Sequence, residues 1–295
     1  MTIDDQESPP QRVAPISVPS EPPRLPQPND SQPAAVRDAF RQCGFALGKE
    51  IAWIEEALTL EHRIVTASTS SKLRNHRYSS ALLLWSRVYT VGQELLRAAT
   101  WGAYPVCPPL IRASLEWLAA EQAVVGREQS EYETWLREAF QPEVELAGTS
   151  IGMGQYMAGQ QLAMSEELGS VYRAAAELAR PHFGASALAV APESNRQRVA
   201  VHWGDQAFHF GWAQLLFGWQ IVIHDRQLRF AIGRDLFAIE AKDRERYHRL
   251  AREGADLLES RDRCRSSWVE KQGRQRLLVE NFRRQAGGAP KRLLL

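Results

Sequence analysis

The sequence predicts an all-α protein: a multi-helix bundle built on a long antiparallel helical hairpin, with a small β-hairpin around residues 187–203. Two observations carry this prediction. Apolar residues recur at steps of three and four through most of residues 34–125, which is the period of an amphipathic helix. A short proline-rich turn interrupts the pattern, and helices joined by a short turn pack antiparallel. The 295 residues, 44% of them hydrophobic, suffice for one large core or two modest ones.

Residues 34–125 contain three successive segments with apolar residues at helical spacing, and the second and third of these predict the hairpin. Residues 34–66 predict the first helix. After a loop rich in serine and threonine, residues 73–101 predict the second helix and residues 110–125 the third. The segment 102–109 between them holds three prolines, which end one helix and suit the first turn of the next. The second and third helices therefore form the predicted hairpin.

The next part of the chain predicts shorter elements. Residues 131–140 and 162–179 predict two helices, and residues 187–190 and 198–203 predict the strands of the β-hairpin. Residues 207–223 are the most apolar stretch. A membrane span needs about 20 apolar residues, whereas this run is shorter and contains polar side chains. It therefore predicts a buried central helix, and no membrane partner is expected.

Composition divides the chain into a disordered tail (1–33), a helical core (34–238) and charged C-terminal helices that pack on or extend the core (239–295). Nine of the 16 prolines lie in the tail among few large apolar residues, so it cannot bury enough surface to fold alone. Its first residues carry acids rather than bases, unlike a signal peptide. Such a tail is either a solubilising leader or a ligand for aromatic grooves.

Charge is balanced over the whole chain but not along it. Lysine and arginine total 36 against 35 acids, a formal net charge of +1, which argues against a general polyanion binder. Residues 226–295, however, contain 18 basic and 10 acidic residues. Acids and bases interleave there at helical spacing, which indicates solvated helix faces. The alternative is that the basic stretch 265–295 binds nucleic-acid phosphates.

Several motifs of known chemistry are missing. The sequence contains no Gly-x-Gly-x-x-Gly, no Walker-type Gly-Lys-Ser/Thr and no His-Glu-x-x-His. Its three cysteines, Cys43, Cys107 and Cys264, lie far apart, and its seven histidines are scattered. We therefore predict no metal site and no other cofactor. An odd number of widely spaced cysteines favours a cytoplasmic protein over a disulfide-stapled secreted one.

Arg112 and Glu116 form one candidate polar site, because they lie four residues apart on one face of an otherwise apolar helix. A buried charge must be paired. We therefore expect the two side chains to neutralise each other, against Arg87 or Glu94 of the preceding helix. Such a pair either fixes the helix register or lines a polar pocket.

Arg196, His202 and His182 form a second candidate site, of catalytic type. If the chain turns between Arg196 and His202, the arginine can bind a phosphate through charge-assisted hydrogen bonds. His202 or His182 would then transfer protons near neutral pH. On one strand, six residues would separate Arg196 and His202 by roughly 20 Å. The alternative is a loop arginine and a histidine packed beside Trp203.

Residues 78–83 and 110–116, followed by His182 and a helical end, resemble a broad family of uncharacterised bacterial helical proteins. At greater distance they resemble the HEPN bundles of toxin–antitoxin and phage-defence systems. The similarity covers about residues 73–225. It implies a metal-independent ribonuclease site with an arginine and a histidine about four to six residues apart, usually at a dimer interface. Arg196 and His202 match that spacing, whereas Gln197 departs from the Asn, His or Asp favoured after the arginine.

Three functions follow from these observations. The first is a non-enzymatic interaction or regulatory protein, in stress or phage defence, that binds a protein partner or self-associates through its aromatic-rich late helix. The second is a HEPN-like endoribonuclease, for which RNA is the partner. The third is nucleic-acid binding through the basic C-terminal stretch.

Overall fold

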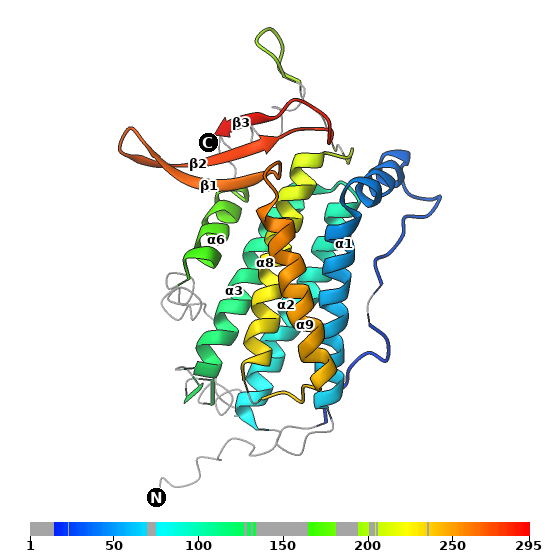
Figure 1. Ribbon diagram of the computed structural model, residues 1–295, viewed down its shortest axis with the longest axis vertical. Coiled ribbons are helices and arrows are strands. Elements are labelled where there is room, and N and C mark those ends of the chain that lie inside the picture. Colours follow the sequence, from blue (N-terminus) through cyan, green and yellow to red (C-terminus); the bar gives the residue numbers. More distant parts are fainter. Residues whose placement is uncertain are drawn as a thin grey trace, which may run out of the picture.

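The computed structural model describes residues 15–22, 24–69, 75–126, 129–130, 132–133, 165–180, 194–200, 204, 206–234 and 236–295. Its helices are α1 (Ala34–Ser68), α2 (His76–Thr100), α3 (Cys107–Gly126), α6 (Glu166–Leu178), α8 (Phe210–Ile232) and α9 (Ala241–Glu259), with a 3₁₀ turn η1 (Tyr104–Val106) before α3. Strands β1 (Arg265–Lys271), β2 (Arg274–Phe282) and β3 (Lys291–Leu294) form an antiparallel sheet in that order. The long helices run side by side, and the sheet lies across one end of them (Figure 1). The predicted mostly helical class is confirmed.

Helix α8 is the central element of the bundle. It packs against α1, α2, α3 and α9, and most of its side chains are buried, so the predicted buried central helix is confirmed. The same packing buries Phe210, Phe217 and Trp219. These three side chains belong to the core, and self-association through this helix stays a prediction. No helix in the described part of the chain is long and apolar enough to cross a membrane.

Local signals set the ends of several helices. The Asn75 side chain accepts a hydrogen bond from the backbone N–H of Tyr78 (2.9 Å) and so caps the start of α2. The proline-containing turn η1 separates α2 from α3. Near the other ends of these helices, Arg77 of α2 donates to the carbonyl of Val125 of α3 (3.1 Å). These contacts position α2 and α3 against each other along the bundle.

The C-terminal part corrects the prediction of charged helices over residues 239–295. Only Ala241–Glu259 is helical, and the sheet occupies the residues that follow. Gln272 and Gly273 have φ of 55° and 70°, the left-handed conformation of a two-residue hairpin turn. Beyond this turn Leu277 and Val279 alternate inward and are buried. This period of two is a strand signal, which the interleaved charges concealed.

The β-hairpin predicted around residues 187–203 falls largely outside the described residues. Of that range the structure describes 194–200, which form a bend and contain no strand. The Asn195 side chain accepts hydrogen bonds from the backbone N–H groups of Gln197 and Arg198, both at 2.9 Å. An asparagine that bonds to its own following backbone is a common turn device.

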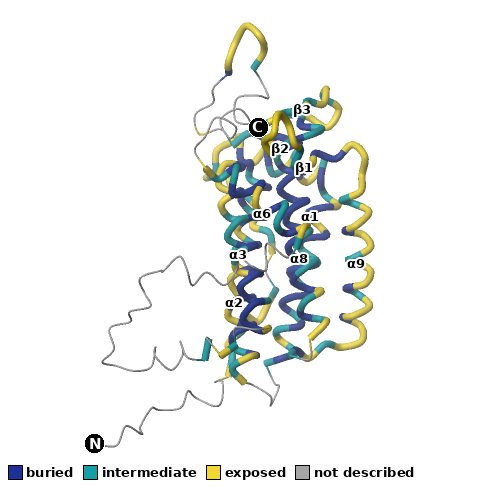
Figure 2. Tube along the Cα trace, turned by 90° about the vertical axis from the view of Figure 1, so that its left-hand side faces the viewer, coloured by how far each residue is buried: buried dark blue, intermediate teal, exposed yellow. Residues whose placement is uncertain are grey.

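Part of the predicted tail lies on the bundle. Residues 15–22 and 24–33, which we call the strap, contain no helix or strand, and they run beside α1 (Figure 1). Ile16 and Leu25 of the strap are partly buried against the core. Residues 1–14 of the predicted tail lie outside the described residues. The exposed outer side of α9, by contrast, carries no such cover in the described part of the chain (Figure 2).

Candidate functional site: a strap over a buried polar cluster

Three polar side chains from three helices meet in the core of the bundle. Glu61 of α1 accepts a hydrogen bond at Oε2 from the indole N–H of Trp85 on α2 (2.8 Å). Its other oxygen, Oε1, lies 2.7 Å from Nδ1 of His224 on α8. The side chains of Glu61 and His224 are fully buried. Both carboxylate oxygens are therefore hydrogen-bonded inside the protein, as a buried charge requires.

A second carboxyl group, Glu121 of α3, lies nearby and is also fully buried. Neither of its oxygens has a well-aligned hydrogen bond within the described part of the chain. Burial raises the pKa of Glu121 well above its ordinary value; the amide of Gln227 partly opposes this shift, and the negative charge of Glu61 adds to it. The site thus favours the protonated form of Glu121.

The helices approach most closely beside His224. A Cβ atom at Gly92 of α2 would lie 2.6 Å from both Cε1 and Nε2 of this imidazole, so a side chain there requires the ring to move. The carbonyl of Gly92 also accepts a hydrogen bond from the side chain of Gln220 on α8 (2.6 Å). Gly92 therefore fixes α2 against α8 at this point.

We call Glu61, Trp85, Glu121, His224 and Gln227 the core cluster. Among the residues that the structure describes, no group of three or more His, Cys, Asp or Glu side chains is placed to hold a metal ion. The cluster joins four helices of the bundle through polar groups. Hydrogen bonds link Glu61, Trp85 and His224, and the cluster also holds one carboxyl group, Glu121, that is favoured in its neutral form.

The strap lies over α1 and α2, directly outside this cluster. It is held by polar contacts through its main chain: the Pro19 carbonyl with Nε2 of His62 (2.7 Å), the Leu25 N–H with Glu55 (3.3 Å), and the Pro26 carbonyl with the indole N–H of Trp101 (3.1 Å). Contacts of this kind recognise an extended backbone rather than particular polar side chains. We call the surface of α1 and α2 beneath the strap the strap groove.

Two hollows remain between the strap and the helices. One of about 120 Å³ lies beneath residues 16–19, and Glu61, Trp85 and Tyr89 are among its lining residues. The other, of about 60 Å³, lies beneath residues 24–26. Burial, followed by the charge of Glu61, raises the pKa of Tyr89, so its phenol remains a neutral hydrogen-bond donor. The strap therefore covers the groove without filling it, and Glu61 belongs to both the core cluster and the groove.

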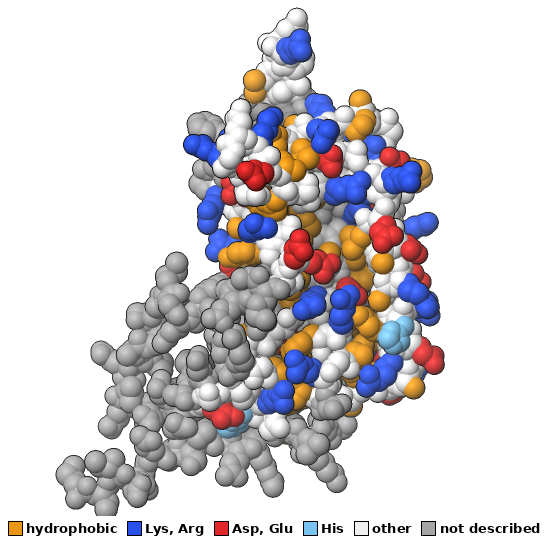
Figure 3. All heavy atoms as spheres, turned by 60° about the vertical axis from the view of Figure 1, so that its left-hand side comes forward, with side chains coloured by type: hydrophobic (Ala, Val, Ile, Leu, Met, Phe, Trp, Pro, Cys, Tyr) orange, Lys and Arg blue, Asp and Glu red, His pale blue; other side chains and the backbone are white. Residues whose placement is uncertain are grey.

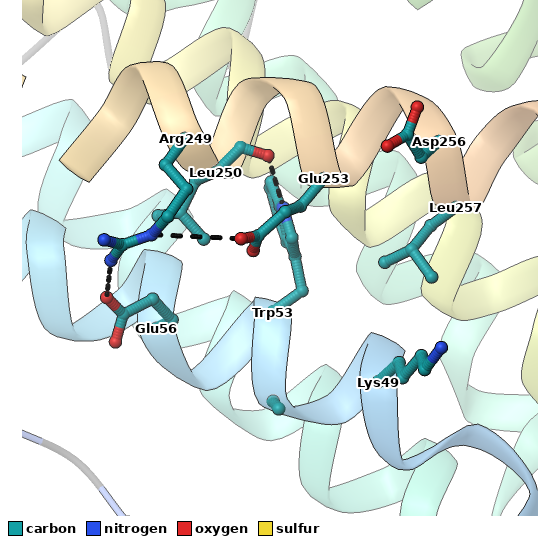
Figure 4. Close-up of a pocket in the computed structure, with 9 residues that line it drawn as sticks. Lys49, Trp53, Glu56, Arg249, Leu250, Glu253, Asp256 and Leu257 are labelled. Atoms are coloured by element: carbon teal, nitrogen blue, oxygen red, sulfur yellow. Dashed lines mark hydrogen bonds and ion pairs between the residues drawn. The ribbon is translucent and has the colours of Figure 1, made fainter. Parts of the chain in front are cut away.

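The opposite flank of α1 faces α9, and side chains rather than an extended segment make the contacts there. A hollow of about 700 Å³ opens between α1 and α9, and Trp53 at its base donates to the carbonyl of Leu250 (2.7 Å). Arg249 lies 3.8 Å from both Glu56 and Glu253 and so spans the hollow (Figure 4). Charges of both signs thus neutralise one another along this flank. Its apolar lining, formed by Ala52, Trp53, Leu250 and Leu257, is flanked by charged side chains of both signs.

The structure brings together one of the two predicted candidate sites. Arg112 Nε donates to Glu116 Oε1 (2.8 Å), and the phenol of Tyr172 on α6 donates to the same oxygen (3.1 Å). The third member is therefore Tyr172 rather than Arg87 or Glu94. The Arg112 side chain is 40% exposed, so this pair lies at the edge of the bundle, where Tyr172 connects it to α6.

The predicted catalytic residues are not brought together in the described part of the chain. Arg196 is exposed on the bend of residues 194–200. His182 and His202 lie outside the described residues. The ribonuclease site built from these three residues therefore stays a prediction.

The core cluster and the strap groove were missed in the sequence. Glu61 and His224 are 163 positions apart, and no motif links them. The signal that could have found the cluster was polar residues within the most apolar helices: Gln220, His224 and Gln227 follow the helical period of three and four. The aromatic residues of α2 were the corresponding signal for a groove that takes a proline-rich segment.

Comparison with known proteins gives no further assignment: no family model matches the chain, and neither a curated protein nor a solved structure matches it.

Proposed function

We propose that this protein is a non-enzymatic interaction and regulatory module whose strap groove binds an extended, proline-rich segment of a protein partner. The observation that carries the proposal is that the chain's own proline-rich strap lies in this groove. In the resting protein the strap is a built-in competitor. A partner segment gains access when it displaces the strap.

The chemistry of the groove suits this class of ligand. Proline-rich segments are stiff and extended, and they dock onto aromatic-lined grooves through their exposed carbonyls. Trp101 and His62 each approach a strap carbonyl, while Trp85 and Tyr89 line the hollow between these helices and the strap. A partner should therefore present carbonyls at the spacing of Pro19 and Pro26, with an apolar side chain in the place of Leu25.

The scaffold in this proposal is the antiparallel hairpin of α2 and α3. The short connection through η1 and the bond from Arg77 to the Val125 carbonyl support that arrangement. Hairpin packing keeps α2 rigid along its length, and the core cluster pins its inner face. A preformed groove binds an extended segment without the entropy cost of ordering itself.

The test adds the strap as a separate peptide. A fluorescein-labelled peptide of residues 12–33 is titrated with the full-length protein and with the full-length variant Ile16→Glu/Leu25→Glu, whose own strap is weakened. A tethered strap competes at an effective concentration of about 1 mM. Fluorescence anisotropy should therefore show binding to the variant at least about tenfold tighter than to the wild type.

The matched control carries the same added charge without loosening the strap. Ser20 and Gln27 are exposed strap residues, so Ser20→Glu/Gln27→Glu should behave like the wild type. His62→Ala, placed in the weakened-strap background, should reduce peptide affinity by several-fold, since one hydrogen bond is worth about 1 kcal/mol. Equal peptide affinity for the wild type, the weakened variant and the control would overturn the proposal.

A further inference from the structure

The hairpin of β1 and β2 projects from the bundle as a two-stranded ribbon (Figure 1). It is paired along its whole length, from Arg265 opposite Glu280 to Lys271 opposite Arg274. Every residue from 270 to 276 is exposed. We call residues 270–276 the ribbon tip.

The base of the ribbon is anchored, so the tip is held in a defined direction. Leu277 and Val279 are buried against the bundle. The indole N–H of Trp268 donates to the carbonyl of Ser170 on α6 (3.3 Å), and the guanidinium of Arg173 lies 5.2 Å from the ring centroid. The ribbon is therefore a rigid arm rather than a loose loop.

One face of this arm gathers positive charge. Residues opposite each other in an antiparallel pair share a face, and so do alternate residues along a strand. Arg265 and Lys271 of β1 therefore share a face with Arg274 and Arg276 of β2. Glu280, at the far end of this face, pairs with Arg292 of β3 (3.1 Å). At the end of the molecule that carries the sheet, lysine and arginine side chains lie among acidic and apolar ones (Figure 3).

Three of the four charged side chains at the tip are basic, and the one acid, Glu270, lies opposite Gln275 on the other face. The ion pairs formed within the described part of the chain leave out Lys271, Arg274 and Arg276. Lys271 and Arg274 face each other directly across the ribbon, and like charges in that position destabilise a strand pair. Such an arrangement costs folding stability, which an anionic partner would offset.

From this geometry we infer that the β1–β2 ribbon binds duplex DNA by entering its major groove. That groove is about 12 Å wide and admits a two-stranded ribbon. Lys271, Arg274 and Arg276, which share one face of the ribbon, contact phosphates or guanine edges, and the exposed amide of Gln272 lies beside them in the turn. The major groove of an RNA duplex is too deep and narrow for this contact. The inference does not rest on the strap groove.

The test is the binding of the full-length protein to a fluorescein-labelled 26-base-pair DNA duplex of mixed sequence, followed by anisotropy over a range of NaCl concentrations. Each phosphate contact adds about −0.9 to the slope of log K against log salt. With three to four cations engaged, the expected slope is about −3 to −4. Lys271→Gln/Arg274→Gln/Arg276→Gln should weaken binding by at least about tenfold and reduce the slope by about 2 to 3.

A control variant removes the same charge elsewhere. Lys242, Arg244 and Arg252 are exposed on α9, and changing all three to glutamine should leave DNA affinity within about twofold. Competition with unlabelled duplex RNA and with vesicles of anionic lipid identifies the partner, since both should compete poorly. The inference is overturned by absence of binding at 50 mM NaCl, by equal losses in the two triple variants, or by RNA or vesicles competing as well as DNA.

Discussion

The two flanks of α1 are closed in opposite ways. Towards α9, ion pairs between side chains hold the interface, and we call them the lock. Two nitrogens of the Arg246 guanidinium donate to the two carboxylate oxygens of Glu56, and Arg263 pairs with Glu50 in a buried site. Towards the strap, the contacts run to the main chain of an extended segment. Hollows occur on both flanks, about 700 Å³ on the α9 side and about 120 and 60 Å³ beneath the strap, so the difference lies in the contacts. Side-chain pairs of the first kind require matching charges at fixed positions. Main-chain contacts of the second kind can be made by any segment with the same backbone shape, which is why we place the exchangeable site on the strap flank.

The largest effect is expected from breaking the lock on the α9 side. Arg263 donates to Glu50 (3.2 Å) and to the carbonyl of Gln214 (2.6 Å), and its side chain is 4% exposed. Arg263→Ala leaves Glu50 buried without a partner and should lower the free energy of unfolding by about 3–5 kcal/mol. Urea unfolding followed by tryptophan fluorescence measures it. Arg246→Ala, at a more exposed pair, should lower the free energy of unfolding by about 1 kcal/mol. Equal losses in the two variants would contradict the conclusion that the buried Arg263–Glu50 pair is the stronger contact.

An intermediate effect should distinguish two glycines, one on each side of α1. A Cβ at Gly92 meets the His224 ring at 2.6 Å, whereas a Cβ at Gly254 of α9 meets Trp53 at 3.1 Å. Gly92→Ala should therefore lower the free energy of unfolding by about 1–3 kcal/mol. At Gly254 the helical preference for alanine, about 0.5–1 kcal/mol, should offset much of the milder crowding. Thermal unfolding of the two variants compares them; a Gly254 variant as unstable as the Gly92 variant would show that the core cluster is not the tighter contact.

A smaller effect concerns pH and the core cluster. The pKa of Glu121 is raised in the folded protein, so between the unfolded and folded pKa values the folded state binds more protons. Stability must then fall as pH rises through that window. Glu121→Gln removes the penalty and should stabilise the protein at pH 8 by about 1 kcal/mol or more, with little change at pH 4.5. Urea unfolding at the two pH values tests this; a variant less stable than the wild type at pH 8 would show that the carboxylate is needed.

The sequence predicted what depends on local pattern. The helical period of residues 34–66 and 110–125 and the apolar run 207–223 correspond to α1, α3 and α8, because each helix buries a face that the period reveals. The Arg112–Glu116 pair was found for the same reason, since both residues lie on one helix.

The sequence did not reveal which distant residues contact each other, and the secondary structure predicted for the charged C-terminal segment was wrong. Residues 265–294 were assigned to helices because their charges interleave, and the turn at Gln272 and Gly273 was overlooked. Glu61, Trp85 and His224 come from three helices, and only the packing of the bundle brings them together. The strap was missed because its composition alone describes a chain that cannot fold by itself, whereas in the protein it packs on a surface made by other residues.

Exchange of the strap is the central claim, and one measurement tests it directly. Ser17 is exposed and lines the hollow next to Trp85, so bimane attached to Ser17→Cys is quenched by that indole while the strap is docked. The native thiols Cys107 and Cys264 are buried, and burial raises their pKa to about 12; burial also raises the pKa of Cys43. All three therefore react slowly, and the label is selective.

The labelled full-length protein is titrated with unlabelled peptide of residues 12–33. Emission should rise and saturate, with a midpoint near the effective concentration of a tethered segment, about 1 mM, while far-ultraviolet circular dichroism stays unchanged. Emission that stays quenched at every peptide concentration, and rises only when urea unfolds the bundle, would show that the strap is a fixed part of the fold and would contradict the account.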